Sequence, residues 1–208
     1  MSAQQLYSMI AWFWDAGSYM VGHLREAEYV VNHLPIDSQK PINVLDIGCG
    51  TGLYTRNILR RFPHAKVTAI DLSKQMLGEL QSSLKKRGWD HRVTILHGDA
   101  IATAKKLQGP FDLIVTAGLL EYLDDKALLD VIAQKLAPAG TYLNSSVRDT
   151  VSGRVIGLLA RCRTSTTRST IDLCTRRGMR LERLITVPET IWYFPACHYK
   201  EGQVYRKA

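Results

Sequence analysis

An α/β fold built on a mostly parallel sheet is predicted by three features of the 208-residue sequence. Short stretches of β-branched and apolar residues alternate with helical stretches along the chain. One of the short stretches, residues 111–118, is apolar almost throughout, which is typical of a parallel strand covered on both faces. Another, residues 44–47, runs directly into a turn with three glycines, and a strand, turn and helix in this order can hold a nucleotide-like cofactor.

The remaining elements are expected from the same patterns. Strands are expected at residues 44–47, 66–71, 93–100 (ending in Gly-Asp-Ala), 111–118, after the Pro-Gly turn within 136–146, at 180–187 and at 203–207. Helices are expected at about 6–14, 18–34, 54–62, 74–86, 101–107, from Asp124 or Asp125 to 137, and at 151–163 and 169–177. Ser73 is expected to cap the start of the helix at 74–86 and Gly88 to close it, and Gly178 to cap the helix at 169–177.

The spacing of Gly48, Gly50 and Gly52 argues against a dinucleotide site. That site would read G-x-G-x-x-G, with an acidic residue about 20 positions further on. Here the third glycine comes one position early, and Asp46 precedes the first, where a negative charge suits a cationic group better than a pyrophosphate. A P-loop is excluded because no Gly-Lys-Ser/Thr follows the turn.

The stretch 44–52 (VLDIGCGTG), together with the acids that end the next two strands, resembles motif I and its companions in class I S-adenosylmethionine-dependent methyltransferases. The resemblance implies a seven-stranded, doubly wound, Rossmann-like sheet with strand order 3-2-1-4-5-7-6, an antiparallel last hairpin and an N-terminal helical lid. It also implies that Asp71 accepts hydrogen bonds from both ribose hydroxyls and that Asp99 takes the adenine amino group. The residues expected to bind S-adenosylmethionine are Asp46, Gly48, Cys49, Gly50, Gly52, Asp71, Leu72, Met76, Asp99, Ala100 and Ala117.

A single domain is expected over residues 1–208, with N-terminal helices at 1–40, a cofactor-binding core at 41–150, and substrate-side helices and the hairpin at 151–208. The sequence has no stretch typical of a membrane span or a signal peptide. The cysteines are scattered without a C-x-x-C pair, so we expect no metal, no disulfide framework and a cytoplasmic location. They are Cys49, Cys162, Cys174 and Cys197.

The methyl acceptor is expected beyond the fourth and fifth strands, at the topological switch point. The Asn/Asp-Pro-Pro-Tyr/Phe motif of relatives that methylate DNA bases or protein glutamine is missing there. Glu121 and Tyr122 are candidates for a general base or for orienting the acceptor. The alternative is that Glu121 is a solvated acid at a helix start and Tyr122 a packing residue, since methyl transfer can proceed by positioning alone.

Aromatic residues near the N-terminus supply a second set of acceptor candidates. Together with residues after the fourth strand, the expected acceptor-binding residues are Tyr7, Trp12, Tyr19, Leu119 and Tyr122. An aromatic cage could hold a planar or cationic acceptor, whereas the competing interpretation is a helix that packs its apolar face on the core. His198 is a further candidate base, or simply a solvated loop residue.

The net charge of +8 is concentrated late in the chain. In the segment Arg154–Arg163 two apolar pairs, Val155-Ile156 and Leu158-Leu159, lie between Arg154 and Arg161, which predicts a short basic amphipathic helix. Such a helix can lie on an anionic membrane or meet nucleic-acid phosphate, or it can be a solvated insertion. Of the first two, the membrane is favoured, and nucleic acid is not expected as a partner.

The function expected from the sequence is methyl transfer from S-adenosylmethionine to O, N or C of a small organic molecule, such as a natural product or an apolar metabolite. One alternative is a methyltransferase that acts on a lipid or quinone at the membrane surface. Another is a non-catalytic S-adenosylmethionine-binding protein. A nicotinamide oxidoreductase is disfavoured by the glycine spacing. The sequence makes no prediction of the oligomeric state.

Overall fold

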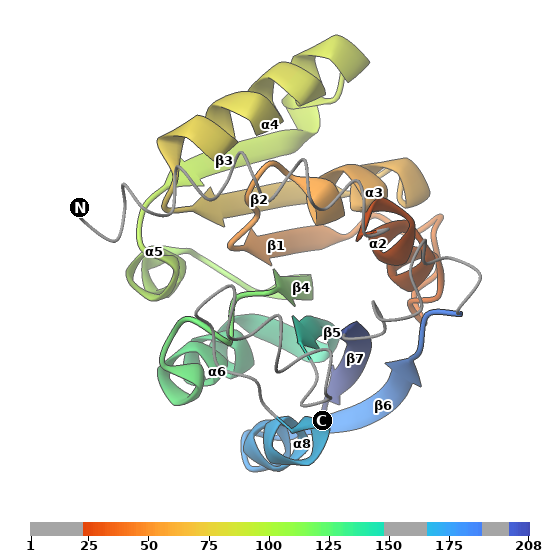
Figure 1. Ribbon diagram of the computed structural model, residues 1–208, viewed down its shortest axis with the longest axis vertical. Helices are drawn as coiled ribbons and strands as arrows, with labels where there is room; N and C mark the ends of the chain where they lie inside the picture. Colours follow the sequence, from red (N-terminus) through yellow and green to blue (C-terminus); the bar gives the residue numbers. More distant parts are fainter. Residues whose placement is uncertain (1–22, 148–165, 189–199) are drawn as a thin grey trace.

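A computed structural model describes residues 23–147, 166–188 and 200–208 of the chain. Its seven strands form one sheet in the order β3-β2-β1-β4-β5-β7-β6, as predicted (Figure 1). The strands are β1 (Asn43–Ile47), β2 (Lys66–Asp71), β3 (Val93–His97), β4 (Phe111–Ala117), β5 (Leu136–Val147), β6 (Met179–Ile185) and β7 (Lys200–Lys207).

The direction of the strands changes at β7. The pairs β1–β2, β1–β4, β2–β3 and β4–β5 are parallel, whereas β7 is antiparallel to both β5 and β6. The antiparallel hairpin predicted at the end of the sheet is therefore confirmed. The strand order reverses between β1 and β4, so the carboxyl ends of these two strands mark the switch point at which such sheets bind ligands.

Helices cover both faces of the sheet (Figure 1). One apolar core lies between the sheet and α2, α3 and α4, and the other lies between the opposite face and α5, α6 and α8. The helices are α2 (His23–Asn32), α3 (Leu53–Arg61), α4 (Lys74–Arg87), α5 (Ala100–Lys106), α6 (Asp125–Lys135) and α8 (Thr167–Thr175), with a 3-10 turn η1 (Asp90–Arg92) before β3.

The predicted element bounds hold to within a few residues, except at β5. This strand begins at Leu136 rather than after the Pro-Gly turn. Phe111 pairs with Leu136, the register then shifts, and Leu113 pairs with Thr141. The turn is therefore an irregularity inside the strand, with Ala139 at a φ of 54°.

Two predicted helices, at 6–14 and 151–163, lie outside the described residues. The lid prediction can be followed only in α2, which packs against the sheet and α3. Within the described parts of the chain, no helix has the length and apolar character needed to cross a bilayer.

Helix α4 has the two caps that the sequence predicts. Ser73 Oγ accepts a hydrogen bond from the amide of Met76 at 3.3 Å, which satisfies one of the free donors of the first turn. At the other end Gly88 adopts a φ of 67°, and its amide bonds to the carbonyls of the last turn. Position 88 therefore needs a left-handed residue, which glycine supplies without strain.

Two glycine substitutions in this helix should have opposite effects on stability. Gly88→Ala should lower the free energy of unfolding by about 1 kcal/mol, because an L side chain is strained at positive φ. Gly78→Ala should raise it by roughly 0.5–1 kcal/mol, because this exposed helical position has nothing within 4 Å of an added Cβ. Urea unfolding measures the free energy of unfolding of both variants. Changes of the same sign would contradict the different roles assigned to Gly88 and Gly78.

Candidate cofactor site

The glycine loop at the carboxyl end of β1 is held against the end of β2. The amides of Gly48 and Cys49 both donate to the carbonyl of Ile70, at 2.8 and 2.9 Å. The three loop glycines have φ values of 73°, 53° and 85° at Gly48, Gly50 and Gly52. Side-chain-bearing residues rarely adopt such angles, so the path of the loop depends on glycine.

Two of these glycines are also required by packing. A Cβ on Gly48 would lie 2.8 Å from Leu119 Cδ1, and a Cβ on Gly52 would overlap Leu80 Cδ1. At Gly50 the nearest side-chain atom is Met76 Sδ, at 3.5 Å from an added Cβ. Packing therefore leaves no room for a side chain at Gly48 or Gly52, whereas the surroundings of Gly50 are less crowded.

Asp71, at the end of β2, is joined to the loop. Its Oδ2 accepts from the amide of Gly50 and its Oδ1 from the amide of Ser73, both at 2.8 Å. The second bond is the local Asx turn of an Asp-x-Ser sequence, but the first spans the loop and was not predicted. Each carboxylate oxygen has a further lone-pair position, so the group can still accept hydroxyl donors.

Asp46, which precedes the loop, is bonded to helix α3. Its side chain is almost fully buried, and Thr55 Oγ1 on α3 donates to Oδ2 at 2.5 Å. Burial raises the pKa of this carboxyl to about 6, with a further contribution from the charge of Asp71, while the Thr55 hydrogen bonds oppose the rise. Thr55 was not predicted, because its partner is on the other side of the loop in the sequence.

The ends of β2 and β3 bring together the residues predicted to hold the adenosine. Asp71 is in register with His97, and Asp99 follows two residues later as the N-cap of α5. Asp99 Oδ1 accepts from the amide of Ala102 at 2.8 Å. Leu72, beside Asp71, is 51% exposed, which is unusual for a large apolar side chain.

His97 is a residue of this edge that the sequence did not indicate. Its Nε2 lies 3.1 Å from the carbonyl oxygen of Leu72, so the ring fixes the backbone there. Ala100, also predicted to bind the cofactor, begins α5 directly after Asp99.

The end of β4 supplies the wall opposite the loop. Thr116 pairs with Ile47, so the half-buried Ala117 lies beside Gly48. After Ala117 the chain turns at Gly118, with a φ of 64° and an amide that donates to the carbonyl of Ser145 at 2.8 Å.

Glu121 is not the solvated helix-start acid of the alternative interpretation. Its side chain is only 4% exposed, and α6 starts later, at Asp125, with Asp124 as its cap. Burial, then the neighbouring Cys174 and Glu121, raise the pKa of Tyr142, while a hydrogen bond with Thr116 opposes the rise. Glu121 therefore lies close to the buried β4–β5 surface.

Tyr122, by contrast, is partly buried, and its amide donates to the carbonyl of Leu119 at 3.0 Å.

Several predicted residues cannot be placed in this site. Outside the described residues lie Tyr7, Trp12, Tyr19, His198 and Arg154–Arg163. Over residues 23–147, 166–188 and 200–208, no three His, Cys, Asp or Glu side chains gather as a metal site would require. Cys49 and Cys174 are buried free thiols, and burial raises the pKa of Cys49, so this loop thiol is not activated.

Comparison with known proteins gives a family for the part of the chain that forms this site. Residues 44–140 match the family model described as "Methyltransferase domain". The match starts in β1 and includes the glycine loop, Asp71, Asp99 and the end of β4.

Two of the curated relatives that the chain resembles are named as methyltransferases. Over 112 residues the chain is 35% identical to the malonyl-[acyl-carrier protein] O-methyltransferase of Halalkalibacterium halodurans, which covers 51% of this chain and 40% of that protein. Over 129 residues it is 32% identical to the trans-aconitate 2-methyltransferase of Pseudomonas aeruginosa strain UCBPP-PA14, covering 61% and 44%. The matched part of the chain therefore spans less than half the length of these relatives.

A solved structure supports the fold over a larger share of the chain. The magnesium protoporphyrin IX methyltransferase of Synechocystis PCC 6803, solved with bound SAH, superposes with a TM-score of 0.71 at 17% identity. The superposition covers 90% of this chain and 84% of that one. The strand order and this superposition thus give the chain the fold of a solved methyltransferase, and residues 44–140, which hold the glycine loop, are similar to the methyltransferase domain.

Proposed function

We propose that this protein transfers a methyl group from S-adenosylmethionine to O, N or C of a small organic molecule. The observation that carries the proposal is the pair of hydrogen bonds that Asp71 accepts from Gly50 and Ser73. They place a carboxylate at the edge of a glycine loop that has no room for side chains at Gly48 and Gly52. A carboxylate in this position suits a ribose diol, and the bare loop suits a ligand lying against backbone.

The other residues of the site fit the remaining parts of this cofactor. Leu72 and Met76 would offer apolar surface to the adenine, and Asp99 a carboxylate oxygen to its amino group. The buried Asp46 would supply negative charge near the cationic end, while Ala117 limits the space beside it. When bound, S-adenosylmethionine supplies a methyl group on a positively charged sulfur, open to in-line attack by an acceptor.

The chain's part in the transfer would be to orient the acceptor and exclude water. Residues Leu119–Tyr122 follow the end of β4, next to Ala117, and are the described residues best placed for this role. The burial of Glu121 suits a proton acceptor shielded from water, if the acceptor is one that must lose a proton. The two curated relatives are named for methylation of malonyl-[acyl-carrier protein] and trans-aconitate, so carboxylic acids belong in a first acceptor panel.

Binding of the donor tests the proposal directly. Titration calorimetry should show S-adenosylmethionine binding to the wild-type chain and a Kd weakened about 100-fold or more in Asp71→Ala, because two hydrogen bonds to a charged group are lost. The matched control is Asp172→Ala, an exposed acid on α8, which should bind like the wild type.

Formation of S-adenosylhomocysteine then tests catalysis. The panel should include carboxylic acids, phenols, amines and lipid or quinone acceptors, with the product measured by mass spectrometry. No heat of binding would refute the cofactor site. Binding without product across the panel would instead favour a non-catalytic S-adenosylmethionine-binding protein.

The affinity for S-adenosylmethionine should rise with pH through about 6. The pKa of Asp46 is about 6 without ligand, so its carboxyl is mainly neutral at pH 5 and mainly ionised at pH 7. The amino group of the ligand stays cationic over this range, and only the ionised acid attracts it. The Kd should therefore be about tenfold weaker at pH 5 than at pH 7.

Asp46→Asn is the matched variant for this measurement, because an amide oxygen can still accept from Thr55 but cannot ionise. Its Kd should be nearly independent of pH between 5 and 7. A wild-type Kd with the same flat profile would show that the ionisation of Asp46 does not contribute to binding.

We also propose that Arg154–Arg163 contacts an anionic membrane, because two apolar pairs lie between Arg154 and Arg161 in that segment. We also propose a cytoplasmic location, supported by the scattered cysteines. If the segment docks on lipid, vesicles containing anionic lipid should pellet the protein, and high salt should release it. The protein would stay in the supernatant at low salt if the segment is only a solvated insertion.

A further inference from the structure

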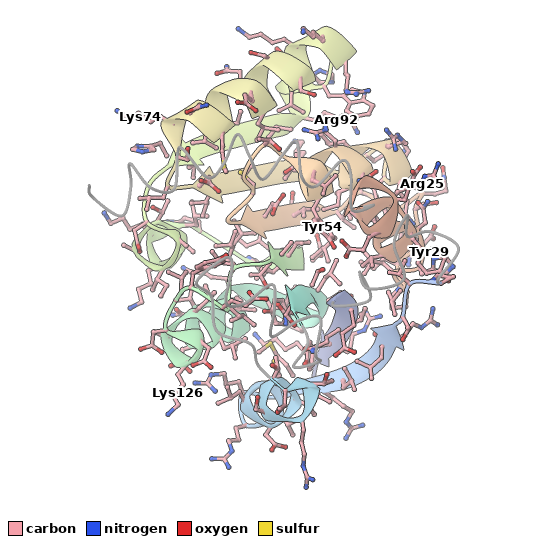
Figure 2. The ribbon with its side chains drawn as sticks, viewed as in Figure 1. Arg25, Tyr29, Tyr54, Lys74, Arg92 and Lys126 are labelled. Atoms are coloured by element: carbon pink, nitrogen blue, oxygen red, sulfur yellow. The ribbon has the colours of Figure 1, made fainter. Side chains whose placement is uncertain are left out.

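Glu26 is a charged residue on α2 that the cofactor assignments leave unexplained. It is fully buried, with 0% exposure, although carboxylates are seldom buried without bonding partners. The neighbouring Arg25 is exposed and Tyr29 half-buried, and both lie on the outer side of α2 (Figure 2). The helix therefore turns Glu26 inward.

One oxygen of this carboxylate joins two other elements. Glu26 Oε1 accepts from Tyr54 OH at 2.9 Å and from Ser145 Oγ at 3.0 Å. Tyr54 is in the first turn of α3 and lies inward of α2 (Figure 2). Ser145 is near the end of β5, so a single group connects α2, α3 and the sheet.

Both partners of Glu26 lie next to walls of the cofactor site. Tyr54 comes two residues after Gly52, the last glycine of the loop. Ser145 pairs with Ala117, and its carbonyl accepts from the amide of Gly118 at the turn after β4. The carboxylate thus holds the end of the glycine loop on one side and the end of β4 on the other.

The close approach of α2 to this edge of the sheet depends on small residues. Ser145 pairs with Ala117 on one side and with Gly202 on the other. A Cβ on Gly202 would lie 2.9 Å from Cγ1 of Val30, which is one helical turn after Glu26. Helix α2 therefore packs closely against β7, and this packing fixes the position of Glu26 relative to its partners.

Tyr54 is suited to act as a permanent donor. Its hydroxyl is buried, and burial, then the charge of Glu26, raise its pKa well above the ordinary value, with a smaller contribution from Asp46. A hydroxyl that stays protonated at neutral pH keeps donating to Glu26.

We propose that Glu26 is a positioning residue of the cofactor site, which sets the spacing between the glycine loop and the end of β4 through Tyr54 and Ser145. The proposal rests on the proposed function, because the ligand whose affinity it controls is S-adenosylmethionine. The charge of Glu26 is not required in this role. What is required is an oxygen that accepts both hydroxyl hydrogens.

The test compares four variants by titration calorimetry with S-adenosylmethionine, below their melting temperatures. Glu26→Ala removes both bonds and should weaken the Kd about tenfold, whereas Tyr54→Phe and Ser145→Ala remove one bond each and should weaken it severalfold. Glu26→Gln keeps an acceptor oxygen and should restore the Kd to within about twofold of the wild type. Glu28→Ala is the matched control, since this half-exposed acid on the same helix pairs with the surface residue Arg60 and should leave the Kd unchanged.

Two further readouts separate positioning from a loss of stability. The effects of Glu26→Ala and Tyr54→Phe on the Kd should be less than additive, because they break the same bond. When an acceptor is known, both Glu26→Ala and Tyr54→Phe should show a raised KM for S-adenosylmethionine, while their kcat at saturation stays near the wild-type value. If Glu26→Ala fails to fold, the near-isosteric Tyr54→Phe and Ser145→Ala carry the test.

The outcomes are distinguishable from failure of the proposed function. If the wild type binds no S-adenosylmethionine, the proposed function falls. If the wild type binds but Glu26→Ala, Tyr54→Phe and Ser145→Ala bind equally well, only the role of Glu26 is overturned. A Glu26→Gln variant as weak as Glu26→Ala would also overturn it, because charge and not bonding geometry would then control affinity.

Discussion

The attachment of the glycine loop to the end of β2 is the constraint on which the site depends. A loop with three residues at positive φ has little intrinsic preference for a single conformation, because glycine restricts its backbone so little. Three hydrogen bonds select a single loop conformation. The amides of Gly48 and Cys49 donate to the carbonyl of Ile70, and the amide of Gly50 donates to Asp71. Asp71 is also the residue predicted to bind the ribose, so the residue that orders the loop is the one proposed to bind the ligand.

Packing from two further elements completes this constraint. Leu80 on α4 and Leu119 after β4 occupy the space that side chains at Gly52 and Gly48 would need. The shape of the loop is therefore sensitive to residues that do not belong to it. The bonds of Glu26 add a third element, α2, so the loop is supported from the sheet, from α3 and α4 and from the N-terminal side of the fold.

Sequence reasoning succeeded where a signal was local. The caps of α4 at Ser73 and Gly88 follow from the chemistry of single residues next to a helical pattern. The strand order followed from resemblance to a family rather than from periodicity, because apolar runs do not tell which strands are neighbours. Where the outcome depended on partners distant in sequence, no signal was present. Thr55 beneath Asp46, and Tyr54 and Ser145 around Glu26, are such cases. The early start of β5 was missed for a related reason, since the pairing of Leu136 with Phe111 overrides the turn preference of the Pro-Gly sequence.

The place of β7 between β5 and β6 has a consequence for the order in which the chain can fold. In the described sheet β6 is paired with β7 alone, and β7 also pairs with β5. During synthesis β6 leaves the ribosome before the strand that attaches it to the sheet. Until β7 arrives, β5 presents an unpaired strand edge, of the kind that invites pairing with another chain. The inner strands and their glycine loop can assemble earlier, because β1 to β4 need nothing from this last step. Completion of the fold is thus a late, non-local event, and the interval before it is when a nascent chain would most need protection by chaperones.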